Sequence, residues 1–136
     1  MYQAGLVLEG GGMRGLFTAG VLDYFIDLGM EFQEVYGVSA GICNACSYLS
    51  KQRGRSLRVN TDYLEGPRYC SVESLIRPEI CSERICFTES YRMSWTRMTM
   101  RRFQKYPGGR MQVVTNCETG KQNICGFAGW TRTYRR

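Results

Sequence analysis

The stretch LVLEGGGMRG, Leu6 to Gly15, leads from an apolar run through three consecutive glycines into a helix-like pattern. Glycine loses more backbone freedom on folding than any other residue, so three in a row require a structural reason. The run GLVL, residues 5–8, predicts a buried strand that ends at the glycines. Three interpretations suit the loop that follows: a nucleotide-binding loop, a plain tight turn, or part of a catalytic centre.

Two helices are expected after this loop. Apolar residues at helical spacing predict a helix over residues 14–28 that packs on a sheet, with Gly29 as its C-cap glycine; the spaced residues are Phe17, Val21, Tyr24 and Leu28, and the residues that widen the stripe are Leu16, Leu22, Phe25 and Ile26. A short strand at Val35 and Tyr36 precedes a second buried helix, indicated by Ile42, Ala45, Cys46 and Leu49. The alternation of strand and helix predicts an α/β sandwich with a largely parallel sheet.

The pentapeptide GVSAG, Gly37 to Gly41, fits G-x-S-x-G between the expected strand and helix. At such a sharp turn the Ser39 hydroxyl faces outward, and the small neighbours Gly37 and Gly41 let the backbone bend and a substrate approach. The start of the next helix places the positive end of its dipole near developing negative charge. A purely structural glycine-serine turn is the alternative.

Gly10, Gly12 and Gly15 also satisfy G-x-G-x-x-G, the dinucleotide fingerprint, with Glu34 near the distance of its acidic partner. Glu34 precedes the second strand-like piece, however. A phosphate-binding P-loop is excluded, because Leu16 and Phe17 stand where Lys and Ser or Thr are needed. An oxyanion hole is the third option, since backbone N–H groups of a glycine loop reach a tetrahedral oxygen unobstructed.

GGGMRG followed by GVSAG, with VVTNCETG further along, resembles the patatin-like phospholipases, and Met before Arg resembles their bacterial members. The resemblance is best over residues 4–76 and 111–121 of a single partial domain spanning 1–136. It implies a three-layer α/β/α sandwich, incomplete at its C-terminal side, and a serine acyl hydrolase that cleaves lipid carboxylic esters through an acyl-Ser39 intermediate without a cofactor or metal. It also implies an oxyanion region; its residues would be Gly10, Gly11, Gly12 and Arg14, with Gly15, Gly37 and Gly41 shaping the motifs.

The base of this family is an aspartate in a D-G-G or D-G-A motif, not a histidine, and the chain contains no histidine. A Ser-His-Asp triad within the chain is therefore excluded. The three aspartates, Asp23, Asp27 and Asp62, are not followed by glycine, and we expect the first two to face solvent or its edge. Without a base the serine is a weak nucleophile. We therefore expect a truncated or altered form of a longer enzyme, with a non-catalytic acyl-lipid or anionic-surface binding remnant as the alternative and a dinucleotide-binding domain as a lesser one.

Charge and cysteine content indicate the surroundings of the chain. Residues 1–50 hold one base and five acids, whereas residues 51–136 hold seventeen bases and seven acids. Such asymmetry favours an anionic partner or a solvated basic face. We expect peripheral contact with an anionic membrane and no nucleic acid, although YRMSWTRMTMRRFQKY, Tyr91 to Tyr106, mixes bases with aromatics. Seven cysteines without a secretion signal favour reduced thiols in the cytoplasm, and Cys43 and Cys46 are expected to be packing thiols.

Overall fold

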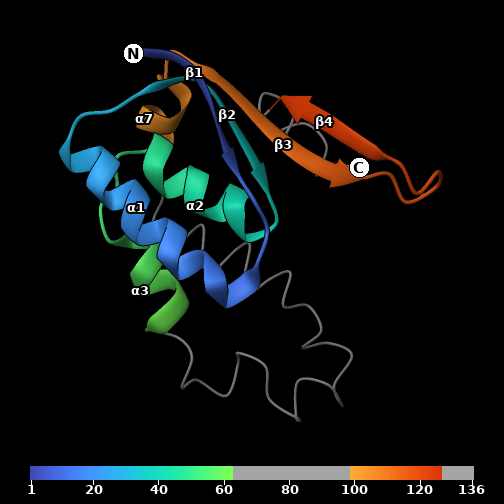
Figure 1. Cartoon of the computed structure of the whole chain (residues 1–136), viewed down its shortest axis with the longest axis horizontal. Coiled ribbons are helices and arrows are strands. Elements are labelled where there is room, and N and C mark those ends of the chain that lie inside the picture. The colour runs from blue at the N-terminus through green and yellow to red at the C-terminus, as the bar shows by residue number, and fades with distance from the viewer. Residues whose placement is uncertain (63–98, 127–136) are drawn as a thin grey trace.

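Three parallel strands and one antiparallel strand form the sheet of this protein in a computed structural model that describes residues 1–62 and 99–126 (Figure 1). The strands lie in the order β1-β2-β3-β4, and β4 is antiparallel to β3. The mixed α/β class with a largely parallel sheet is thus confirmed. The elements in chain order are β1 (Tyr2–Leu8), the 3-10 turn η1 (Gly12–Arg14), α1 (Gly15–Asp27), β2 (Phe32–Val38), α2 (Ala40–Leu49), α3 (Arg55–Thr61), α7 (Met100–Gln104), β3 (Gly109–Thr115) and β4 (Gln122–Gly126).

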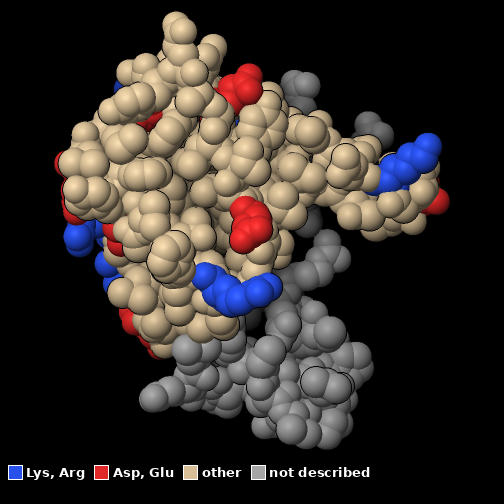
Figure 2. Space-filling view, in the orientation of Figure 1, with Lys and Arg blue, Asp and Glu red and all other residues tan. Residues whose placement is uncertain are grey.

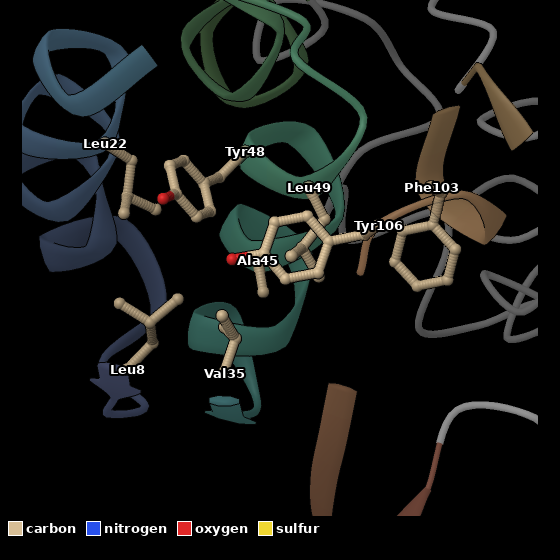
Figure 3. Packing of buried hydrophobic residues seen from close by; sticks show 8 residues of the cluster. All are labelled: Leu8, Leu22, Val35, Ala45, Tyr48, Leu49, Phe103 and Tyr106. Carbon is tan, nitrogen blue, oxygen red and sulfur yellow. The ribbon is translucent and has the colours of Figure 1, made fainter. Parts of the chain in front are cut away.

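The core lies between the sheet and helices α1 and α2. Leu8 and Val35 project from neighbouring strands toward α2, where Ala45 and Leu49 meet them (Figure 3). Side chains alternate between the two faces of a strand, so the residues next to Leu8 and Val35 along each strand point to the opposite face of the sheet. Val7 on that opposite face is 72% exposed. Within the described residues the helices therefore cover one face of the sheet. The expected three-layer sandwich needs helices on the opposite face as well, and the described helices do not form that layer.

Helix α1 confirms the expected helix and its end, but not its packing stripe. Gly29 has φ 64°, and its N–H donates to the Ile26 carbonyl while the Met30 N–H donates to the Phe25 carbonyl, as in a Schellman C-cap. Leu22 is buried against the core. The residues expected to pack instead face outward; they are Phe17, Val21, Tyr24 and Leu28. Because apolar residues surround most of α1, its periodicity could not select the buried face.

The strands extend beyond the segments that the sequence predicts. β2 runs from Phe32 to Val38, because it pairs with a strand on each side and its polar residues Gln33 and Glu34 remain exposed. The sequence of residues 121–136 shows no clear helix or strand period, yet Gln122–Gly126 forms β4 in a hairpin with β3. The Asn116 side chain accepts hydrogen bonds from the N–H groups of residues 118 and 119, which closes this turn.

Several sequence-based expectations lie outside the described residues. They concern the part of the resemblance over residues 63–76, most of the stretches 78–105 and 121–136, in which the sequence shows no clear helix or strand period, and half of the segment 91–106 that mixes bases with aromatics. At the end of that segment, α7 places Phe103 in the core, and Tyr106 follows it there.

The Tyr106 hydroxyl joins the segment after α7 to the start of β2. It donates to the Phe32 carbonyl at 2.7 Å and accepts the Phe32 N–H at 2.8 Å. Tyr106→Phe leaves both backbone groups without this partner in a largely buried place, so we expect a loss of about 1–3 kcal/mol in the free energy of unfolding. Urea denaturation followed by circular dichroism measures the change.

Tyr36 provides a matched control, because its hydroxyl donates to the Glu34 carboxylate at the surface. Tyr36→Phe is expected to change the free energy of unfolding by less than about 0.5 kcal/mol. Equal effects of the two substitutions would show that the Tyr106 hydroxyl does not join the two segments as described.

Candidate active site

Ser39 occupies the sharp turn between β2 and α2. Its backbone has φ 49° and ψ −121°, a conformation that non-glycine residues rarely adopt and that costs about 1–3 kcal/mol. Its side chain is exposed, and although Ser39 is the N-cap residue of α2, its hydroxyl makes no capping hydrogen bond. The turn therefore presents the hydroxyl to solvent beside the N-terminus of α2, as a nucleophile elbow does.

Two glycines that flank Ser39 allow this turn through close backbone contacts. A Cβ on Gly41 would lie 2.2 Å from the Leu8 carbonyl oxygen, and a Cβ on Gly37 would lie 2.6 Å from the Ile42 Cα. Real Cβ atoms essentially never come this close to other atoms. Both positions therefore require glycine: Gly41 lets the end of β1 meet the start of α2, and Gly37 lets the end of β2 meet the first turn of α2.

The glycine loop after β1 lies directly against Ser39. A Cβ on Gly10 would be 3.2 Å from the Ser39 Cβ and 3.9 Å from its hydroxyl oxygen. Gly12 has φ 54° and opens η1, in which the Arg14 N–H donates to the Gly11 carbonyl at 3.1 Å. Two segments that are separate in the sequence therefore form one surface, and the exposed Arg14 side chain lies at its edge.

A buried asparagine connects the two segments, and the sequence analysis did not identify it. Asn44 is 3% exposed, and its side-chain amide donates to the Gly15 carbonyl at 2.9 Å. A Cβ on Gly15 would meet this amide at 3.1 Å and the Ala40 Cβ at 3.3 Å. The start of α1 is thus held against the first turn of α2. The available signal was a polar residue in an otherwise apolar helical pattern.

The dinucleotide interpretation does not fit the position of its acidic residue. Glu34 lies in the middle of β2, not at its carboxyl end, and its carboxylate accepts the Tyr36 hydroxyl at 2.7 Å. In a dinucleotide-binding fold the acid follows the second strand and faces the ribose. The loop at the end of β2 is instead the Ser39 turn.

Comparisons with known proteins identify the family of this chain. The sequence profile of the patatin-like phospholipases matches residues 6–111. The chain belongs to the patatin-like phospholipase family. It is also 44% identical over 59 residues to the uncharacterized protein YjjU of Escherichia coli (strain K12). That alignment covers 43% of this chain but only 16% of YjjU. No solved structure matches the chain significantly.

The family resemblance implies an aspartate as the base, and the three aspartates of the chain all lie in the described residues. Both carboxylate oxygens of Asp23 accept the Gly54 N–H at 3.0 Å, and Asp27 pairs with Arg53 at 2.8 Å. Asp23 is half-buried in this contact and Asp27 is exposed, which agrees with the expected positions at the solvent face or its edge. Asp62 is exposed beyond α3 and accepts the Thr61 hydroxyl. Each described aspartate thus has another partner.

The cysteines that follow the Ser39 turn, on α2, have the character of packing thiols. Cys43 and Cys46 are half-buried on α2, and neither is in a disulfide. Burial raises the pKa of Cys43, and burial together with neighbouring Cys43 raises the pKa of Cys46 to about 12. Such thiols remain protonated at neutral pH, whereas a metal ligand or a redox nucleophile must be a thiolate. Residues 1–62 and 99–126 contain no group of three or more side chains suited to holding a metal ion.

No helix in the described part of the chain has the length and apolar character needed to cross a bilayer.

Proposed function

We propose that this patatin-like phospholipase family member is a serine acyl hydrolase for lipid carboxylic esters, with Ser39 as its nucleophile. The contact between the Gly10 loop and Ser39 supports the proposal best, because it brings the backbone of the glycine loop against the exposed Ser39 side chain. A strained serine turn that caps a helix without using its own hydroxyl has no evident structural purpose. Strain of this kind is typical of functional sites.

In the proposed reaction the Ser39 oxygen attacks the ester carbonyl carbon and the alcohol leaves, which forms an acyl-Ser39 ester. Water then attacks this ester and releases the fatty acid. Negative charge develops on the carbonyl oxygen in both steps, and N–H groups of the glycine loop would stabilise it. The Arg14 N–H is engaged with the Gly11 carbonyl, so Arg14 would act through its exposed guanidinium. The first N–H groups of α2 also lack partners within the helix and supplement the loop.

A second candidate function is capture of acyl lipids without turnover. It is favoured by the aspartates: the chain has three, all of them described, and each has another partner. A serine without a positioned base lacks the usual means of losing its proton. Binding at the Ser39 surface would persist in such a protein, because the glycine loop and the helix terminus are independent of the base.

A fluorophosphonate probe tests whether Ser39 is the nucleophile. Oxyanion stabilisation and binding alone retain about 10³–10⁴-fold of rate enhancement in hydrolases that have lost their triad. We therefore expect slow phosphonylation of Ser39, located by peptide mass spectrometry, and none at that position in Ser39→Ala. Ser50→Ala is the matched control, because the Ser50 hydroxyl is buried and donates to the Cys46 carbonyl. Labelling spread evenly over the exposed serines would contradict the proposal.

A further inference from the structure

Helix α1 carries an outward-facing row of large apolar and aromatic side chains, here called the α1 stripe. Phe17 is 80% exposed, and Tyr24 is 61% exposed. Figure 2 shows a broad area with few charged residues over the position that α1 occupies in Figure 1. The full stripe consists of Met13, Phe17, Val21, Tyr24 and Leu28.

The stripe is opposite the side of α1 that packs. Ala19 and Leu22 are each 3% exposed and face the core, whereas Phe17, Val21 and Tyr24 recur at helical spacing on the far side. A surface helix ordinarily directs polar residues outward. Folding of the described residues does not require these side chains to be apolar, because they contribute little to the core.

The rim of the stripe combines arginines with acids that are already engaged. Arg14 is exposed where α1 begins, and Arg58 is exposed on the neighbouring helix α3. The two carboxylates of α1 are held by other groups: Asp27 pairs with Arg53, and Asp23 accepts the Gly54 N–H. Apolar and aromatic side chains flanked by arginines are typical of helices that lie in the interface of a membrane.

The stripe is continuous with the Ser39 site. Met13 and Arg14 belong to η1, which follows the glycine loop, and Gly15 at the start of α1 approaches the Ala40 Cβ beside the exposed Ser39. A lipid ester in a bilayer has to reach the nucleophile from the aggregate surface. Contact through this helix would bring that surface to the same side as the start of α1 and the loop.

We propose that the α1 stripe docks this chain on the surface of a phospholipid bilayer. The inference rests on the proposed function, because lipid substrates are what makes a bilayer the favoured occupant of the stripe. Its apolar side chains supply most of the binding, and the arginines at its rim strengthen binding to anionic lipid.

Flotation of the 136-residue chain with phosphatidylcholine vesicles, with and without phosphatidylglycerol, tests the docking. The double variant Phe17→Ser, Tyr24→Ser removes two exposed rings, and we expect its partitioning onto vesicles to fall about ten-fold or more. Ile124→Ser is the matched control, since Ile124 is 60% exposed on β4. Its partitioning should remain within about two-fold of the parent chain. Equal losses in both variants would overturn the proposal.

A spectroscopic measurement locates the contact. In Phe17→Trp the additional tryptophan emission should shift to the blue when vesicles are added, whereas the additional emission of Ile124→Trp should not. A chain that dimerises through the stripe and does not float with vesicles would overturn the proposal in favour of a second copy as the occupant. Fluorophosphonate labelling of Ser39 needs no vesicles, so it fails independently if the proposed function is wrong.

Discussion

Gly41→Ala is expected to destabilise the protein by about 3 kcal/mol or more. This is the largest effect that we expect from adding one methyl group at any glycine in the described part of the chain. The added Cβ would lie 2.2 Å from the Leu8 carbonyl oxygen and 2.7 Å from the Glu9 carbonyl oxygen. Both neighbours are backbone atoms, so no side-chain rotation relieves the clash. The start of α2 would have to move away from the end of β1, which also separates Ser39 from the glycine loop. Urea denaturation measures the loss of stability.

Gly20→Ala is the matched control for this substitution. Gly20 lies within α1, and a Cβ there would meet nothing within 4 Å. Alanine is favoured over glycine in a helix interior by about 0.5–1 kcal/mol, so this variant should be slightly more stable than the parent. The statement that the Ser39 turn requires glycine at position 41 is wrong if Gly41→Ala unfolds at the same urea concentration as the parent chain.

Hydrolysis of a p-nitrophenyl ester by the 136-residue chain is expected to be about 10²–10⁴-fold slower than by hydrolases with a positioned base, because such a base contributes that factor. The aspartates that the structure describes have other partners, and the sequence contains no further aspartate and no histidine. The aspartate that the family resemblance implies as the base, or a histidine in its place, is therefore not provided to the Ser39 hydroxyl by this chain. Initial rates measured by release of p-nitrophenol test the expectation.

Ser39→Ala distinguishes the site from general surface reactivity in the same assay. Its rate should be lower than that of the parent chain, whereas Ser50→Ala should leave the slow rate unchanged. Turnover as fast as that of ordinary esterases, abolished by Ser39→Ala, would show that another group of the chain acts as the base. The Ser39 proposal would then hold and the account of the missing base would not.

Local patterns were sufficient for the first part of the fold. The helix over residues 14–28 and its glycine cap were predicted from spacing alone, because helical periodicity and a C-cap glycine are local signals. β4 was missed, since its residues form a strand only through pairing with β3. β2 was predicted too short for the same reason, because hydrogen bonds to two neighbouring strands hold its polar residues in the sheet.

The residues of the candidate site also divide into those predicted from local signals and those positioned by contacts between elements. Ser39 and its flanking glycines were predicted from a five-residue motif, since the turn geometry restricts which residues are allowed there. The contacts of Asn44 and Asp23 were not predicted. Asn44 bonds to Gly15, and Asp23 bonds to Gly54, so each partner lies in a different element. The spacing of residues within one helix or strand carries no information on contacts between different elements.

By itself the sequence of this protein determined the two helices that follow the glycine loop and the serine turn, where that turn lies and that no histidine can serve it, because these properties depend on neighbouring residues and on composition. Only the tertiary structure decided that the loop LVLEGGGMRG lies against Ser39 and that Phe17 and Tyr24 face outward. The physical reason is that an apolar helix can bury any of several faces. The packing of α1 on α2, fixed by the Asn44–Gly15 contact and the closeness of Gly15 to Ala40, selects one of them.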